Sequence, residues 1–543
     1  MSGRAQVLEY GTFPNPPSPL FRDYLAGAPG VRPFYVSEAR WDHEALLGSM
    51  GRVADAPRPL QAVAEALARQ QEERGAPRAA ERALSLTAKD AVAIVTGQQP
   101  VLFGGPLFVL YKALAAVVVA ERLQAQRGTP VVPVFWVASD DHDFAEIRSV
   151  SVLDEAGALR TLRYAPVREP AGQPASQVLF DDSITALVEE LRSALPAGLH
   201  REAVVARVAA CYRPGHSLGS AFARLISLMF PDLVVLDPAD PAIKKHMVPV
   251  MSRELSERSP SSRLALAAGE RLLAAGYHQQ VPLRDGFFNL FVVIDGERRA
   301  LAVRDGAVEI RGLGREIPLA ESLRHLETRP ADWSPGVLLR PVAQDTMLPT
   351  LAYVGGPAEV AYHAQIGPSY AHFGAERPIL FPRPSVTVVE PAQARALEAE
   401  RLSLCDLQAD PEAVLARWAR EAYPDVEAAF DHARDALERE MAAVEAALGA
   451  VDPTLRAAAE AAKGRALHQV EGLQEKSTRA LKKRDQVRAE RLRRTRDALL
   501  PGGSLQERGL GWIGLLARQG EAIVGDLRER IDPFARGHQV VSL

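Results

Sequence analysis

Cysteine is almost absent from this sequence, which contains only Cys211 and Cys405 among its 543 residues. Two cysteines cannot build a disulfide framework, and they cannot supply the three or four thiolates of a structural zinc site. We therefore expect that any thiol chemistry involving this protein uses a thiol carried by a substrate.

Lysine is also scarce, because only eight of the 64 basic residues are lysine and the others are arginine. A P-loop needs Gly-Lys followed by Ser or Thr, since the lysine contacts phosphate and the hydroxyl contacts Mg²⁺. Lys476 is the only lysine followed by such a hydroxyl residue, and it is preceded by glutamate. The sequence therefore excludes ordinary P-loop chemistry.

Long apolar runs are missing as well. The strongest run, residues 113–120, is far shorter than the roughly 20 residues that cross a bilayer. The start, MSGRAQVLEYGTFPNPPSPL, lacks the basic and apolar regions of a secretion signal.

The net charge is only −4, which argues against a general binder of polyanions. We expect a soluble, cytoplasmic protein with no membrane partner and no nucleic-acid partner.

The composition predicts several packed domains, since 47% of the residues are apolar. Residues 1–90 are expected to form a helical region packed on a core at residues 91–390. Residues 391–510 are expected to form a helical coiled-coil arm, and residues 511–543 a tail that packs back on the core.

The core alternates strands and helices. A strand at 92–96, a Gly-rich connection, a helix at 106–127 and a strand at 131–138 form a βαβ unit, whose right-handed crossover makes the two strands parallel. The alternation continues with strands at 233–236, 350–354 and 378–381, and with helices at 217–230, 241–258 and 357–373. This pattern predicts an α/β fold with a Rossmann-like, doubly wound parallel sheet.

Two insertions interrupt this core, near residues 150–200 and 280–330. The second predicts a β-meander, because three short apolar runs are separated by Asp-Gly turns at 295–296 and 305–306. After residue 390 the strand signals vanish. Apolar residues then recur every three or four positions from 426 to 448, and a second helix is expected from 453 to 500. We interpret this region as an antiparallel coiled-coil hairpin whose seam forms a dimer contact.

Polar residues follow three of the predicted strands, where ligands bind in open α/β sheets. The first group is Gln98 and Gln99, followed by Gly104, Gly105 and Pro106 before a helix. The glycines let backbone amides approach a ligand, and the helix start favours phosphate or carboxylate. A tight turn without a ligand is the structural alternative.

The second group is the most distinctive, because Asp140, Asp141, His142 and Asp143 are consecutive. Crowding is expected to raise the pKa of at least one carboxyl group and to keep the histidine cationic or hydrogen-bonded. The cluster suits acid/base catalysis or amine binding. A solvated acidic turn and a magnesium site are weaker alternatives.

The third group follows the strand at 350–354 and includes a second glycine pair before a helix. The strand that follows it exits into a polar, cationic segment that suits a carboxylate or phosphate. The candidate binding residues in these two segments are Tyr353, Gly355, Gly356, Glu359, Tyr362, His363, Gln365, Arg383, Ser385 and Thr387.

Four segments carry a family resemblance: TGQQPVLFGGPLFVLYK, VPVFWVASDDHDFAEI, LAYVGGPAEVAYHAQIG and FPRPSVTVVE, in this order and before the helical hairpin. They resemble the bacillithiol biosynthesis family BshC, the cysteine-adding enzyme, and the resemblance covers the chain from about Val92 to its end. It implies a Rossmann-type core related to class I aminoacyl-tRNA synthetases and nucleotidylyltransferases, with connective insertions and a coiled coil that forms homodimers.

The resemblance also implies a reaction. A ligase would join the carboxyl group of cysteine to the amine of glucosaminyl malate, in the last step of bacillithiol biosynthesis. ATP or ADP is a family expectation that the resemblance attaches to no residue. Gly104 to Leu107 take the place of the first synthetase signature and 383–387 that of the second. The first lacks its histidines, and Arg383 is the only cation in the second.

Amide formation needs an activated acyl group and a neutral amine. We expect Asp141 or His142 to receive the amine proton. The helix-start amides after Gly105 are expected to stabilise the acyl oxygen or a phosphate, and Arg383 is expected to hold an acidic group.

Three other functions remain open from the sequence. Ser217 lies in a G-x-S-x-G pattern, which is typical of serine hydrolases, although it also suits a helix N-cap. Residues 476–496 contain ten basic and two acidic residues, which favours RNA binding by a nucleotidyltransferase-like or synthetase-like protein. A purely structural coiled-coil scaffold is the third, and it leaves the polar strand ends unexplained.

Overall fold

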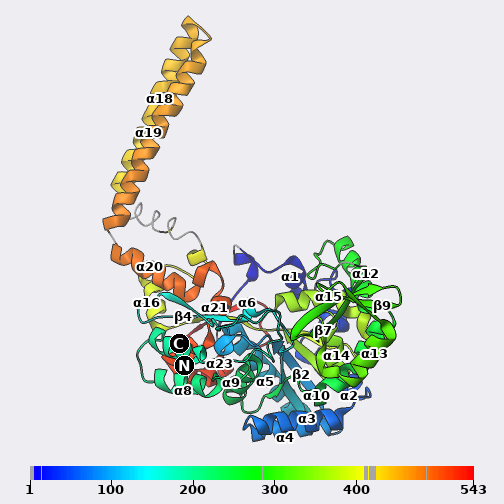
Figure 1. The fold of residues 1–543 in the computed structure, drawn as a ribbon. Coiled ribbons are helices and arrows are strands. Elements are labelled where there is room, and N and C mark those ends of the chain that lie inside the picture. The colour runs from blue at the N-terminus through cyan, green and yellow to red at the C-terminus, as the bar shows by residue number, and fades with distance from the viewer. Residues whose placement is uncertain (1–4, 14, 284, 409–413, 415–422, 485) are drawn as a thin grey trace. The chain divides into compact units, whose positions relative to one another are not determined.

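A five-stranded parallel sheet, of which Figure 1 labels strand β2, forms the core of the larger of two compact units. The computed structural model describes residues 5–13, 15–283, 285–408, 414, 423–484 and 486–543. The strands lie in the order β13-β12-β2-β3-β6. Their bounds are Val92–Gln98 for β2, Val131–Val137 for β3, Val234–Leu236 for β6, Thr350–Gly355 for β12 and Ile379–Pro382 for β13. Nearly every residue of these strands is buried, which explains their continuous apolar runs.

The sheet is doubly wound, as the sequence predicts. From β2 the chain moves through helix α5 (Leu107–Arg127) to β3 and then through α9 (Leu218–Met229) to β6. On the other side of β2 it moves from β12 through α15 (Pro357–Phe373) to β13. The winding direction therefore reverses between β2 and β12, and right-handed crossovers place α5 and α15 on opposite faces.

The chain divides into two compact units, residues 1–389 with 504–543, and residues 390–503. In the first unit, apolar side chains of the N-terminal helices join the strands in one core, for example Leu46 and Leu67 with Ile94. These helices are α1 (Pro19–Ala26), α2 (His43–Ala54), α3 (Leu60–Glu73) and α4 (Pro77–Leu84).

The first insertion contains an antiparallel hairpin and helices. Its elements are α6 (Phe144–Ile147), β4 (Ser149–Leu153), β5 (Leu159–Arg163), α7 (Ser183–Ala194) and α8 (Arg201–Cys211). The second insertion is an antiparallel sheet in the order β10-β9-β8-β7-β11. These strands are β7 (Phe287–Ile294), β8 (Glu297–Arg304), β9 (Ala307–Ile310), β10 (Arg315–Pro318) and β11 (Trp333–Pro335), with α13 (Leu319–Thr328) between the last two.

The structure corrects two local predictions in this unit. The meander has five strands, because β10 and β11 are too short to show alternation in the sequence. The helix expected at 241–258 is two helices, α10 (Pro241–Lys244) and α11 (Val248–Ser256), joined by a 3₁₀ turn. Pro249 stands at the start of α11, where its missing N–H costs no helical hydrogen bond. The remaining helices before residue 389 are α12 (Pro260–Ala274) and α14 (Arg340–Asp345).

Both ends of the chain meet in a third sheet, in the order β1-β15-β14. Strand β15 (His538–Ser542) lies between β1 (Gln6–Leu8) and β14 (Ser385–Val389). Residues 385–387, which we expected as a polar exit from the parallel sheet, therefore form a strand of a separate sheet. Between residues 504 and 537 the chain forms α21 (Gln506–Gly509), α22 (Trp512–Gln519) and α23 (Ala522–Arg530).

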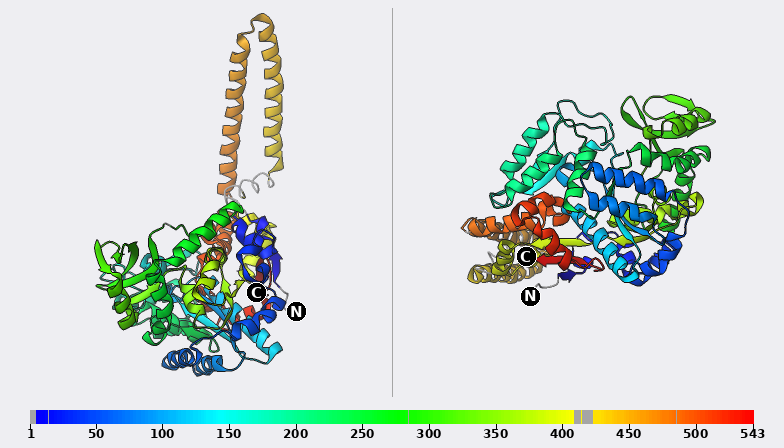
Figure 2. Two further views of the ribbon diagram at one scale, coloured as in Figure 1. Left: turned by 90° about the vertical axis from the view of Figure 1, so that its right-hand side faces the viewer. Right: turned by 90° about the horizontal axis from the view of Figure 1, so that it is seen from below.

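The second unit is helical. Helices α18 (Pro424–Val451) and α19 (Leu455–Arg484) lie side by side as an antiparallel hairpin (Figure 2). Arg434 donates to Gln474 across the pair at 2.7 Å, and Gln474 donates to Glu427 at 2.8 Å. The unit also contains α16 (Pro391–Glu400) and α20 (Gln486–Leu499).

Parts of the predicted arm, residues 409–413, 415–422 and 485, lie outside the described residues. The second helix of the hairpin was expected to continue to residue 500, and it is described as α19 and α20 on either side of residue 485. Among the helices that the structure describes, none is long and apolar enough to cross a membrane.

Candidate active site

A cavity of about 550 Å³ lies at the carboxyl edge of the parallel sheet. Residues that end β2, follow β3 and follow β12 line it, so it opens at the point where the winding reverses. This is the position at which open α/β sheets bind ligands. Ten of the predicted site residues line the cavity: Gln98, Gln99, Asp140, Asp141, His142, Tyr353, Gly356, Glu359, Tyr362 and Arg383.

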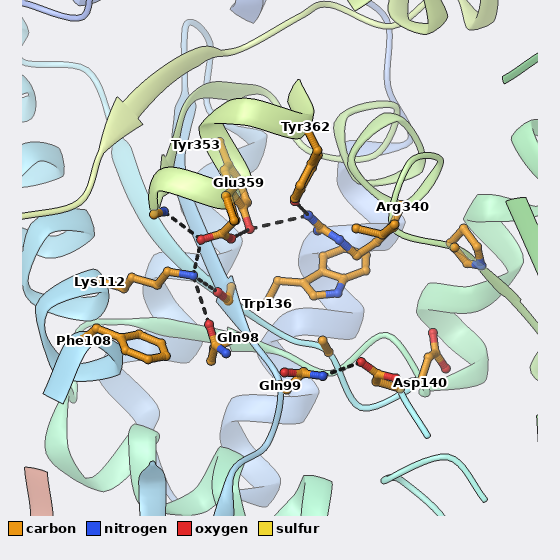
Figure 3. Close-up of a pocket in the computed structure, with 18 of the residues that line it drawn as sticks. Gln98, Gln99, Phe108, Lys112, Trp136, Asp140, Arg340, Tyr353, Glu359 and Tyr362 are labelled. Carbon is orange, nitrogen blue, oxygen red and sulfur yellow. Dashed lines mark hydrogen bonds and ion pairs between the residues drawn. The ribbon is translucent and has the colours of Figure 1, made fainter. Parts of the chain in front are cut away.

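Lys112 occupies the centre of this edge, on α5. Its ammonium group donates to the carbonyl of Gly97 at 2.8 Å and to Oε1 of Gln98 at 3.1 Å, and it lies 2.5 Å from Oε2 of Glu359 (Figure 3). An ammonium group has three hydrogens, and each of them has a protein partner here. Lys112 therefore holds the ends of β2 and α15 together and has no hydrogen left for a substrate.

Glu359 is held as a carboxylate. Burial acts to raise its pKa, but Lys112, the backbone N–H of Gly356 and the hydroxyl of Tyr353 stabilise the charged form, and the pKa lies below its usual value. Tyr353 donates to Oε1 at 2.8 Å, and burial together with Glu359 raises its pKa well above 10. The carboxylate also occupies the N-terminus of α15, where it satisfies the Gly356 amide.

Arg340, from α14, lies opposite Lys112 (Figure 3). Its guanidinium group lies 3.5 Å from the hydroxyls of both Tyr353 and Tyr362, and it donates to Gln344 at 2.8 Å. It also lies 5.5 Å from the ring centroid of Trp136. No carboxylate lies within ion-pair distance of Arg340 among the described residues, so its charge is available to a ligand.

The aspartates after β3 have three different environments. Asp140 accepts from Lys244 with both oxygens at 2.6 Å, and Lys244 is fully buried. Asp141 accepts from Gln99 at 2.6 Å and from the backbone N–H of His142 at 2.7 Å. Asp143 does not line the cavity, because its side chain caps the start of α6.

His142 is hydrogen-bonded, but it is not the cation that crowding suggested. Arg298 lies 3.1 Å from its Nδ1, and a guanidinium group can only donate, so Nδ1 is the acceptor. Burial and the charge of Arg298 lower the pKa of His142 below 6.5. The proton of the neutral ring then lies on Nε2, and His142 has no free basic nitrogen in this arrangement.

The glycine turn before α5 lies away from the cavity, which corrects the expectation for Gly104, Gly105 and Pro106. Trp512 donates to the carbonyl of Gly104 at 2.8 Å, and a side chain at Gly104 would overlap its ring. The amides at this helix start are also used, since Leu107 donates to Leu510 at 2.8 Å and Gly104 donates to Tyr212 at 3.1 Å. The turn is therefore a packing contact for the C-terminal segment.

Arg383 lines the cavity, but its charge is already neutralised. It donates to Glu507 at 2.7 Å, and the two side chains are only 5% and 2% exposed. The neighbouring candidates lie elsewhere, because Ser385 and Thr387 are each 2.8 Å from a ring nitrogen of His538 in the terminal sheet.

Three further candidates lie behind the cavity rather than in it. Gly355 packs against the side chain of Glu359. His363 is fully buried, with its ring stacked near those of Tyr353 and Tyr362 at centroid distances of 5.3 and 4.9 Å. Gln365 exchanges hydrogen bonds with the backbone of Val281.

Several cavity residues were not singled out from the sequence. Lys112, Trp136, Arg298 and Arg340 lie in a helix, a strand, the second insertion and a short helix, where no motif marks them. Only Lys112 left a signal, since it is a charged residue within an otherwise apolar stretch of α5. The arginines could not be found without the fold.

The other motifs have structural explanations. Ser217 caps α9 by accepting from the backbone N–H of Ser220 at 3.1 Å, and the segment before it is helix α8 and not a strand. In the basic run, Arg488 pairs with Glu400 at 2.6 Å and Arg494 with Glu490 at 3.0 Å. Where side chains are described, no group of three or more His, Cys, Asp or Glu has a metal-binding arrangement.

Two family models match the chain. One, described as "Bacillithiol biosynthesis BshC, N-terminal Rossmann-like domain", covers residues 6–384, and the other, "Bacillithiol biosynthesis BshC, C-terminal coiled-coil domain", covers residues 386–543.

Curated proteins from several bacteria are similar over nearly the whole chain. A Salinibacter ruber protein is 35% identical over 540 residues, which are 98% of this chain and 97% of its own. A Koribacter versatilis protein is 35% identical over 94% of each chain, and a Prosthecochloris aestuarii protein is 32% identical over 94% of each. All three are named "Putative cysteine ligase BshC".

Proposed function

Because this chain belongs to the bacillithiol biosynthesis BshC family, we propose that its cleft joins the carboxyl group of cysteine to the amine of glucosaminyl malate. One observation carries the proposal: the cleft has unneutralised guanidinium groups, Arg298 and Arg340, together with the carboxylates of Asp140 and Asp141. Both substrates carry amine and carboxyl groups, so a cleft with both kinds of charge suits them.

Arg340 is placed to stabilise the acyl oxygen. When an amine attacks an acyl carbon, negative charge develops on the oxygen, and a fixed donor that is already oriented lowers the barrier. Hydrogen bonding to Gln344, Tyr353 and Tyr362 fixes the orientation of Arg340 before a substrate binds. Tyr362 can add its own hydroxyl, since burial raises its pKa to about 12 and keeps it protonated.

Asp140 and Asp141 are proposed to hold the amine of glucosaminyl malate. The nitrogen loses a proton as the amide bond forms, and a carboxylate within hydrogen-bond reach can accept it. Lys244 fixes Asp140 and Gln99 fixes Asp141, so both carboxylates have defined positions. His142 is less suitable as the base, because its Nδ1 already accepts from Arg298.

The start of α5, which takes the place of the first synthetase signature, does not fit a nucleotide phosphate. Its amides donate to protein carbonyls and to Tyr212, and Trp512 covers Gly104. The N-terminus of α15 is already satisfied by Glu359. The proposed reaction therefore uses no nucleotide bound at these two helix ends.

We further propose that the protein is a cytoplasmic homodimer that pairs through its hairpin. A single hairpin leaves much of its apolar stripe accessible, with Val444 44% exposed and Leu473 60% exposed. A second copy would cover these residues. Cys211 is a buried free thiol, as expected in a reducing compartment. Light scattering of the wild type and of a Val444→Glu, Leu473→Glu variant tests the dimer, which the variant should lose.

The ligase proposal is tested directly with purified protein, cysteine and glucosaminyl malate, with and without ATP. Mass spectrometry should detect the amide of the two substrates, which has the mass of their sum less one water. Asp140→Asn should reduce its formation at least tenfold, while the matched surface variant Asp305→Asn should not. A cell that lacks the gene and has no second enzyme for this step should accumulate glucosaminyl malate, and normal bacillithiol in that cell would contradict the proposal.

A further inference from the structure

We infer that Arg298 selects the amine-bearing substrate by binding a malate carboxylate. This inference rests on the proposed function and deepens it. Arg298 belongs to β8 of the second insertion, whereas Asp140, Asp141 and Arg340 come from the core. The inserted sheet would then bind the malate part of the substrate, on a side of the cleft separate from the residues that carry out the chemistry.

The guanidinium group of Arg298 has a fixed orientation. It stacks over the ring of Phe291 at 3.6 Å from the centroid, and its Nε donates to Ser334 at 2.9 Å. Nη1 lies 3.1 Å from His142, and Nη2 lies 3.3 Å from the carbonyl of Pro335. Arginine has five N–H groups, so one on each terminal nitrogen remains to donate to a carboxylate.

Arg298 also forms no direct ion pair within the part of the chain that the structure describes. Two other cations of the cleft are paired, Lys112 with Glu359 and Arg383 with Glu507. Lys244, which does not line the cleft, pairs with Asp140. No carboxylate lies within ion-pair distance of Arg298 among the described residues. Burial lowers its pKa, and the more distant charges of Asp140 and Asp141 offset this only in part. A partly buried cation without a directly paired carboxylate is costly, and an anionic substrate would reduce that cost.

Besides Arg383, two other arginines line the cavity, and each is less suited to this task. Arg340 lies among tyrosines beside the proposed reaction centre, where the carboxyl group of cysteine loses its charge as the amide forms. Arg508 is exposed, so water screens its charge. The malate carboxylates keep their charge throughout the reaction, which suits a fixed guanidinium group away from the acyl carbon.

The geometry of the substrate agrees with this assignment. In glucosaminyl malate the amine and the malate are attached to adjacent carbons of the sugar ring. An amine held at Asp140 and Asp141 therefore places malate a few ångströms away. Arg298 lies near these aspartates, because their charges act on it and it contacts His142, the next residue in the chain after Asp141.

The test compares two amines at saturating cysteine: glucosaminyl malate, and methyl glucosaminide, which lacks malate. In Arg298→Met, KM for glucosaminyl malate should rise about 100-fold, from the loss of charge-assisted hydrogen bonds, with kcat within about threefold. KM for methyl glucosaminide should stay within about twofold. Arg298→Lys should give an intermediate rise of about tenfold, because lysine keeps the charge but not the fork.

Arg304→Met is the matched control, since Arg304 lies on the same strand but pairs at the surface with Glu309. It should change neither KM. An equal rise of KM for both amines in Arg298→Met, or no rise for either, would overturn the assignment. Near-ultraviolet circular dichroism of each variant reports whether the inserted sheet is folded.

Failure of the proposed function would look different. A wild-type protein that makes no amide from cysteine and glucosaminyl malate contradicts the ligase, not Arg298. Calorimetric titration of glucosaminyl malate without cysteine still tests the residue, and Arg298→Met should raise Kd about 100-fold. Equal Kd values in the wild type and the variant would reject the carboxylate site.

Discussion

Nζ of Lys112 and Oε2 of Glu359 lie 2.5 Å apart at the point where the winding of the sheet reverses, and Lys112 is only 2% exposed. The pair joins α5 to α15, two helices that belong to opposite directions of winding. The ammonium group also binds the end of β2. One side chain therefore fixes the relative position of the two halves that form the cleft.

Lys112→Met should destabilise the protein by about 3–5 kcal/mol, because it leaves the carboxylate of Glu359 buried without a cation. The double variant with Glu359→Gln should recover part of this loss, since the uncompensated charge is removed. Urea unfolding of the single and double variants measures both effects. Lys245→Met, at an exposed position, is the control, and a Lys112→Met variant as stable as this control would contradict the role we give to the pair.

Arg340→Met should lower kcat about 100-fold to 1,000-fold with a change of KM of no more than a few-fold, because the proposed contact to the acyl oxygen strengthens only in the transition state. Tyr362→Phe should have a smaller effect in the same direction. Steady-state kinetics with varied cysteine separate the two constants, and Arg271→Met provides a surface control. A rise of KM alone would instead assign Arg340 to ground-state binding.

Arg383→Met should act on stability, with a loss of about 3–5 kcal/mol, because Glu507 would remain buried and unpaired. Combining it with Glu507→Gln should restore part of the stability. Denaturant unfolding at pH 7 distinguishes this role from substrate binding, with Arg127→Met as an exposed control. A variant that keeps full stability but has a raised KM would support the role in substrate binding that we expected from the sequence.

His538 should make the folded state less stable in mild acid. Burial, with a contribution from Arg383, lowers its pKa from 6.5 to about 4, although Glu507 opposes the shift. Between these values the unfolded chain binds a proton that the folded chain does not, so the stability falls as the pH falls from about 6.5 towards 4. The loss is on the order of 3 kcal/mol at the acid end.

Urea unfolding between pH 7.5 and 4.5 measures this slope. His538→Gln should flatten it, whereas His468→Gln should leave it unchanged, because His468 is 80% exposed. Identical slopes for the wild type and His538→Gln would show that the buried ring does not resist protonation.

The sequence predicts the wound sheet well because its strands are continuous apolar runs and polar residues follow them directly. Gln98, Asp140 and Glu359 could be found in this way, since strand-end placement alone brings them to one edge. Arg298 and Arg340 could not, because their positions depend on how an insertion and a short helix pack over that edge. The role of Gly104 was also hidden, because Trp512, the residue that packs on it, is about 400 positions away in the chain.

The third sheet has a consequence for synthesis. Strand β15, at residues 538–542, supplies the only hydrogen-bonded link between β1 and β14 in the sheet. While the ribosome still encloses residues 507–542, these positions are not free to pair, and neither Trp512 nor Glu507 has reached its partner. Completion of the core therefore waits until residues 538–542 have left the ribosome, and deleting these residues should trap a partly open intermediate that is prone to degradation.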